Sequence, residues 1–158
     1  MIQRIQSIYL AIVMVLLSSL MSGVELFGFS VQDHYRSYSI YGMQRFASAS
    51  KLSKAEMISH SYLVYLLILF VLLCFYTLMS YRNLNKQLRW ARLLFYIYLS
   101  ALISLLALAS LGFLQKEADQ VHLGLGYYLL VIGFPFCYFA FKSIRKDKEL
   151  LASLDRLR

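Results

Sequence analysis

Four long apolar segments, none of which contains Asp, Glu, Lys or Arg, divide the chain. They cover approximately residues 5–24, 62–81, 93–114 and 123–141. A bilayer core of about 30 Å needs about 20 helical residues, so each segment is long enough to cross it. A soluble helix would keep a polar face, and membrane barrel strands would alternate over about ten residues. The pattern predicts an all-α fold: an integral membrane four-helix bundle in a single domain, residues 1–158.

Composition supports this class. Hydrophobic residues make up 60% of the chain and the mean hydropathy is +0.62, whereas soluble domains are about 45–50% apolar. The first segment follows Arg4, as a secretory signal would. However, a cut after Ser22 or Gly23 would place Leu20 or Met21 where a small residue is needed. We therefore expect a retained membrane anchor.

Lys and Arg lie mostly beside one side of the predicted membrane helices. The N-terminus, the connection 82–92 and the tail 142–158 hold eleven of them, and the segments 25–61 and 115–122 hold five. Positive residues near helix ends remain in the cytoplasm. We therefore expect a multi-pass protein of the cytoplasmic (inner) membrane with both termini cytoplasmic.

The segment 25–61 is too long for a simple turn and is expected to form an outer loop. Its first half alternates loosely around a turn-like Asp-His pair, which is compatible with a short hairpin. Ser53 and Glu56 have the S-x-x-E spacing of a helix start. The second helix is therefore expected to begin near Lys54, outside the bilayer.

Two basic elements on the cytoplasmic side are candidate contacts for a partner or for lipid. In the central connection, helical spacing places three cations on one face, near an interfacial ring; its candidates are Arg82, Lys86, Arg89, Trp90 and Arg92. The cytoplasmic tail 142–158 is predicted to form an amphipathic C-terminal helix. Its candidates are Arg145, Lys146, Asp147, Glu149, Leu150, Leu154, Asp155, Arg156 and Leu157.

Both lipid and protein fit these elements as partners. Anionic lipid headgroups attract each nearby Lys or Arg by about 1 kcal/mol, which would hold the tail on the membrane. The tail also interleaves three acids with six bases, and such alternation suits complementary pairing with another membrane protein in a larger complex. Nucleic acid is not an expected partner, because anionic lipid explains the net charge of +8 on so apolar a chain.

Small residues recur within the apolar segments at intervals that let helix backbones approach closely. The candidate packing positions are Ser18, Ser22, Ser100, Ser104, Gly126 and Gly133. The neighbour at such a seam is either another helix of the chain or another protein. Pro135 lacks a backbone donor and is expected, with Gly133, to kink the fourth helix.

Residues that carry chemistry are scarce. No ionisable group of the kind that marks transport or intramembrane catalysis lies inside the four segments. No nucleophile elbow, Walker loop or zinc-protease motif is present, and the three His residues lack short ligand spacing. Cys74 and Cys137 are expected to be buried thiols rather than a disulfide. The sequence therefore predicts no enzyme, metal site or cofactor.

Three stretches resemble one known family: MIQRIQSIYL at the start, YRNLNKQLRWARL in the centre and IRKDKELLASLDRLR at the end. The chain is similar throughout to the inner-membrane proteins of Bacteroidota catalogued as domain of unknown function 4293. The resemblance implies a protein that spans the membrane four times, and it carries over no catalytic or ligand-binding residue.

Two functions fit these features. The first is a non-catalytic accessory or scaffold subunit of a cytoplasmic-membrane assembly, which docks through the basic elements and the small-residue seams. The alternative is a small oligomeric transporter or channel component with a pore between protomers. A pore needs polar groups facing a cavity, and the segments offer only Ser and Tyr side chains for this purpose.

Overall fold

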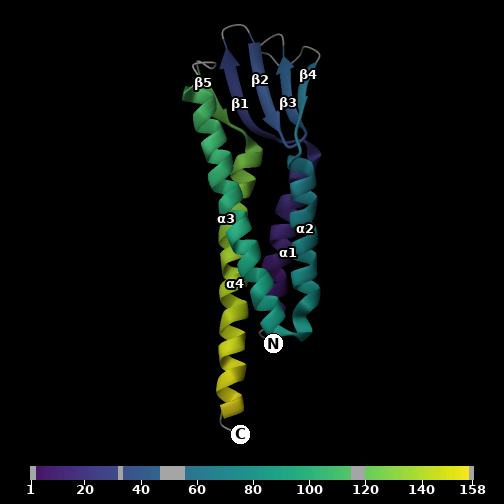
Figure 1. Cartoon of the computed structure of the whole chain (residues 1–158), viewed down its shortest axis with the longest axis vertical. Helices are drawn as coiled ribbons and strands as arrows, with labels where there is room; N and C mark the ends of the chain where they lie inside the picture. Colours follow the sequence, from purple (N-terminus) through teal and green to yellow (C-terminus); the bar gives the residue numbers. More distant parts are fainter. Residues whose placement is uncertain (1–2, 32–33, 47–55, 115–119, 157–158) are drawn as a thin grey trace.

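The computed structural model describes residues 3–31, 34–46, 56–114 and 120–156. Four α-helices form one end of an elongated molecule and a β-sheet forms the other (Figure 1). The helices are α1 (Gln3–Ser19), α2 (Leu63–Met79), α3 (Leu84–Leu114) and α4 (Leu125–Arg156), with 3-10 turns η1 (Leu20–Ser22) and η2 (Ser80–Arg82) after α1 and α2. The strands are β1 (Glu25–Val31), β2 (His34–Ser39), β3 (Gly42–Phe46), β4 (Glu56–His60) and β5 (Gln120–Leu123).

The fold class is therefore α+β, and the predicted all-α fold is wrong. The five strands form one antiparallel sheet in the order β4-β3-β2-β1-β5. Four of them come from the predicted outer loop 25–61, and β5 joins from the connection between α3 and α4. The predicted C-terminal amphipathic helix is not a separate element either, because α4 continues without a break through Pro135 to Arg156.

Strand pairing also moves two predicted helix starts. Glu56–His60, expected within the second helix, instead pairs with β3 as the edge strand β4. The helix α2 begins only at Leu63, whose N–H donates to Ser61 Oγ at 3.2 Å. Ser53 and Lys54 lie outside the described residues. The fourth helix starts at Leu125 instead of residue 123, because Leu123 pairs with Phe27 of β1.

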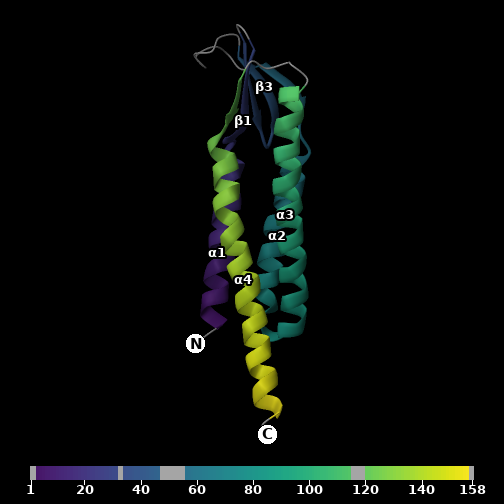
Figure 2. The ribbon, with the colours of Figure 1, turned by 90° about the vertical axis from the view of Figure 1, so that its left-hand side faces the viewer.

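Among the described residues, three helices are long and apolar enough to cross a membrane: α1 together with η1, α3 and α4. The remaining apolar helix, α2, has 17 residues and is about 26 Å long, slightly less than a bilayer core of about 30 Å. With 32 residues, α4 is about 48 Å long. It extends beyond the ends of the other helices, at the end of the molecule where both termini lie (Figures 1 and 2).

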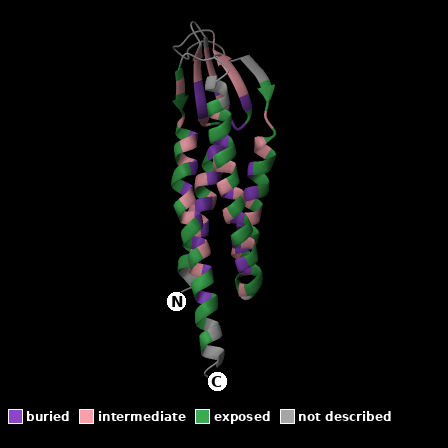
Figure 3. Ribbon diagram, turned by 60° about the vertical axis from the view of Figure 1, so that its left-hand side comes forward, coloured by how far each residue is buried: buried purple, intermediate pink, exposed green. Residues whose placement is uncertain are grey.

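Buried positions alternate with exposed ones along each helix of the helical part (Figure 3). Many of the exposed positions carry large apolar side chains, such as Tyr65, Leu72 and Ile103. The interior includes Leu10 and Val13 of α1, Cys74 of α2, and Leu94 and Tyr98 of α3. The helix α1 packs against α4 and α2, and α3 packs against the same two helices. An apolar exterior of this kind suits contact with lipid.

The sheet is fixed to the helical end by a tight turn and aromatic contacts. Gly42 follows the β2–β3 turn with a φ of 142°, and a Cβ there would overlap the Ser59 carbonyl oxygen. Tyr41 Oη donates to the Met21 carbonyl at 2.5 Å, and the Phe27 ring lies 5.7 Å from that of Tyr127 in α4. These contacts hold the sheet directly above the helices.

On the strands themselves, the Tyr35 hydroxyl donates to the Glu25 carboxylate. Burial, together with this hydrogen bond, raises the pKa of Tyr35 above its usual value. The phenol therefore remains a donor at neutral pH and links β2 to β1.

Candidate interaction sites

The two basic elements predicted from the sequence lie at the same end of the molecule, opposite the sheet. The α2–α3 connection turns at Asn83, and α4 passes this turn on its way to the C-terminus (Figure 1). Exposed cations come from both helices: Lys86, Arg89 and Arg92 from α3, and Lys142, Arg145, Lys146 and Lys148 from α4. We call these seven residues the basic end.

Two acids of α4 have different environments: one is paired with an arginine and the other is buried. The Arg145 Nε donates to Glu149 Oε1 at 2.9 Å, in an exposed pair one helical turn apart. Asp147 is only 6% exposed, and neither of its carboxylate oxygens has a hydrogen-bond partner. Asp147 lies three residues after Ile144 and therefore on the same face of α4. Ile144 packs with Leu88 and Ala91 of α3. The basic end therefore exposes more net positive charge than the sequence alone indicates.

The other predicted contact residues differ in how far they are exposed and described. Trp90 is half-buried and its ring meets that of Tyr76 edge-on at 5.2 Å, which ties the start of α3 to the end of α2. Leu150 is 42% exposed. The helix α4 includes residues 154–156, but the side chains of Arg82, Leu154, Asp155 and Arg156, and all of Leu157, lie outside the described part of the structure.

The predicted packing positions divide into two groups. Ser18, Ser22, Ser100 and Ser104 are exposed, and their hydroxyls donate to carbonyls of their own helical segments. None of the four is buried at a contact between the described helices.

The two glycines are buried at contacts within the chain. A Cβ at Gly126 would lie 3.0 Å from the Glu25 carbonyl oxygen of β1, and one at Gly133 would overlap the hydroxyl of Tyr98 in α3. Gly133 thus permits the close approach of α4 and α3.

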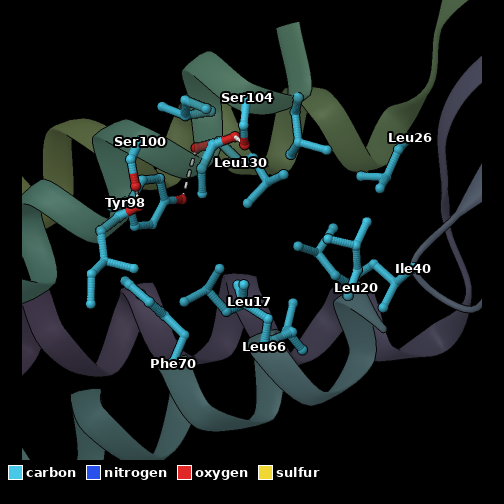
Figure 4. A pocket seen from close by; sticks show the side chains of 16 residues that line it. Leu17, Leu20, Leu26, Ile40, Leu66, Phe70, Tyr98, Ser100, Ser104 and Leu130 are labelled. Atoms are coloured by element: carbon cyan, nitrogen blue, oxygen red, sulfur yellow. Dashed lines mark hydrogen bonds between the residues drawn. The ribbon is translucent and has the colours of Figure 1, made fainter. Parts of the chain in front are cut away.

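An apolar pocket of about 290 Å³ lies between the helices, next to the sheet. Figure 4 shows Leu20, Leu26 and Ile40 at its sheet end, with Leu17 and Phe70 facing Tyr98 and Leu130 across it. The Tyr98 hydroxyl donates to the Leu130 carbonyl at 2.8 Å. No sequence motif indicates this pocket, because its lining comes from all four helices, η1 and the sheet.

Groups suited to chemistry are not assembled within the described ranges. Cys74 and Cys137 are free and buried, as packing groups would be. No cluster of three or more His, Cys, Asp or Glu side chains able to hold a metal occurs among the residues that the structure describes.

Together these features define a small α+β protein with three helices long and apolar enough to cross a membrane and with seven exposed cations at the end opposite the sheet. The chain belongs to the family described as Domain of unknown function (DUF4293), which it matches over residues 2–157. This confirms the resemblance that the three sequence stretches indicated. No curated protein matches the chain.

Proposed function

We propose that the protein is a non-catalytic accessory subunit of a cytoplasmic-membrane protein assembly that docks through the basic end. The observation that carries this proposal is the group of seven exposed cations at one end of α3 and α4. The helix α4 also projects beyond the other helices at this end (Figure 1). A projecting charged helix presents a rigid surface to a partner, and charge complementarity gives such a contact its specificity and speed of association.

In this proposal the basic end lies in the cytoplasm and the sheet lies on the outer side. The bias of Lys and Arg toward the cytoplasm supports this orientation. A reporter active only outside the cytoplasm, inserted at Ser48 or fused after Arg158, tests it; neither position is among the described residues. Activity at Ser48 and silence at Arg158 is expected, and the opposite pattern would reverse the orientation.

Docking is tested by reversing charge at two exposed lysines that lie outside the described Arg145–Glu149 salt bridge. Lys146 and Lys148 are exposed, while the neighbouring Arg145 is paired with Glu149. Full-length protein isolated from native membranes in mild detergent should carry stoichiometric partners. Those partners should be lost from the Lys146→Glu/Lys148→Glu variant and kept by the charge-conserving Lys146→Arg/Lys148→Arg variant.

Binding of the same variants to anionic vesicles measures the attraction to lipid independently of any protein partner. Reversing two charges should weaken vesicle binding as well, because each cation near an anionic surface contributes about 1 kcal/mol. Partners that remain on the Glu variant would contradict docking through the basic end. Isolation of a symmetric homo-oligomer without any other protein would contradict the accessory role and favour the channel alternative.

A further inference from the structure

The pocket between the helices has the shape and surroundings of a lipid site. We propose that it binds one acyl chain of a membrane phospholipid from the leaflet on the sheet side of the bilayer. This inference rests on the membrane placement proposed above, and it adds a ligand that docking at the basic end does not require.

The mouth of the pocket faces sideways, where lipid would surround the helices. Of the lining residues, Leu66 of α2 and Ser100 and Ser104 of α3 are exposed, so the opening lies between these two helices. Next to it, Leu69 is 58% exposed and Ile103 is 61% exposed. A chain from the surrounding bilayer would reach the pocket without leaving an apolar environment.

The sheet end of the pocket is closed by Leu20, Leu26 and Ile40, which are 1%, 1% and 3% exposed. The sheet thus covers the pocket on the side toward the aqueous phase. This closure separates the pocket from the ordinary grooves between neighbouring helices, which continue along the helix surfaces.

Polar groups in the lining do not require a polar ligand. Tyr98 Oη donates to the Leu130 carbonyl at 2.8 Å. The hydroxyls of Ser100 and Ser104 donate at 2.9 Å to the carbonyls of Ile97 and Ala101. With these donors satisfied, contacts in the pocket are mainly dispersion contacts, which an empty pocket would forfeit.

The closed end of the pocket favours a lipid chain over a partner helix. A helix about 10 Å in diameter lying along the opening would meet the residues at the sheet end, whereas an acyl chain can enter sideways and stop against them. The pocket volume of about 290 Å³ leaves room for part of one acyl chain. The protein interior is packed more densely than a liquid, and a chain in the pocket therefore gains contacts over its place in fluid lipid.

The test uses the full-length protein in nanodiscs that contain phosphatidylethanolamine with a diazirine halfway along one acyl chain. After illumination, mass spectrometry locates the residues that carry lipid. We expect adducts concentrated on Leu66, Leu67 and Ala101, with far fewer on the equally lipid-facing Leu72 and Phe75 of α2. An even distribution over these five positions would overturn the proposal.

Two matched variants separate the pocket from general lipid contact. Ser104→Phe places a ring in the mouth, whereas Ala107→Phe places the same ring on an exposed position of α3 that does not line the pocket. We expect Ser104→Phe to lower pocket adducts by about tenfold, because a filled site excludes the chain, and Ala107→Phe to leave them unchanged. Ser100→Phe serves the same purpose if Ser104→Phe does not fold. Equal labelling in all variants would refute the site.

The results of these experiments distinguish failure of the lipid site from failure of docking at the basic end. An isoprenoid recovered at one molecule per chain in extracted lipids would overturn the acyl-chain assignment while partner binding stays intact. Absence of adducts from every helix would overturn the membrane placement itself. Loss of partners with the pocket adducts retained would contradict only the docking proposal.

Discussion

Gly133 is a buried position where a single added methyl group should have a calculable effect on stability. Its added Cβ would overlap the Tyr98 hydroxyl and come within 3.3 Å of Tyr98 Cζ. Tyr98 is 2% exposed and its ring meets Phe70 edge-on at 5.5 Å, so a shift of the tyrosine would disturb that ring contact. The substitution Gly133→Ala should therefore separate α4 from α3 or displace the tyrosine from its hydrogen bond with Leu130.

The expected magnitude combines three contributions. Overpacking a well-filled contact costs about 1–3 kcal/mol, and loss of an interhelical hydrogen bond in a membrane protein costs about 0.6–1.7 kcal/mol. Alanine offsets about 1 kcal/mol through its higher helix propensity. Gly133→Ala should thus lower the free energy of unfolding by about 1–3 kcal/mol, a fall in Tm of about 2–4 °C per kcal/mol.

A double-mutant cycle tests the stated cause. Tyr98→Phe alone should cost about 1 kcal/mol, the value of one hydrogen bond. Because it also removes the oxygen that meets the new methyl group, the Tyr98→Phe/Gly133→Ala variant should return to within about 1 kcal/mol of the natural protein. Thermal unfolding in one detergent measures all four proteins. Additive effects, or a harmless Gly133→Ala, would refute the reasoning.

Four further substitutions test three buried side chains and one exposed ion pair. Asp147→Asn should raise the free energy of unfolding by at least about 1 kcal/mol, because it removes a buried carboxylate that has no hydrogen-bond partner among the described residues. Glu149→Gln, which breaks only an exposed pair, should change the free energy by less than about 0.5 kcal/mol; a larger loss with Asp147→Asn than with Glu149→Gln would show that the Asp147 carboxylate has a stabilising partner. Cys74→Ala and Cys137→Ala should each cost about 1 kcal/mol through a small cavity and leave partner recovery unchanged. Loss of partners at normal protein level would reveal a role for the thiols beyond packing.

The apolar helices were predictable because their signal is local. Each long run without a charge meets the requirement for crossing a bilayer by itself, and the structure has a helix over most of each run. The break at Asn83 and the clustering of basic residues near helix ends also follow from short stretches of chain. Family membership rests on such stretches as well.

The alternating first half of the loop 25–61 was compatible with a hairpin, and β1 and β2 pair as neighbouring antiparallel strands. The complete five-stranded sheet could not be predicted from local patterns. The strand β5 has only four residues, and it exists because it pairs with β1, about 90 residues earlier in the chain, which nothing in QVHL indicates. The S-x-x-E spacing was misleading for a related reason: the segment from Glu56 onward pairs with β3 as the edge strand β4.

The candidate sites show the same division between local and long-range information. Sequence alone determined which residues are charged and that Lys and Arg gather near particular helix ends. Only the tertiary structure decided that Asp147 is buried and that Trp90 packs on Tyr76. It also decided that side chains from four helices and the sheet enclose a pocket. The physical reason is that charge and hydropathy belong to single residues, whereas burial, pairing and enclosure depend on segments brought together from distant parts of the chain.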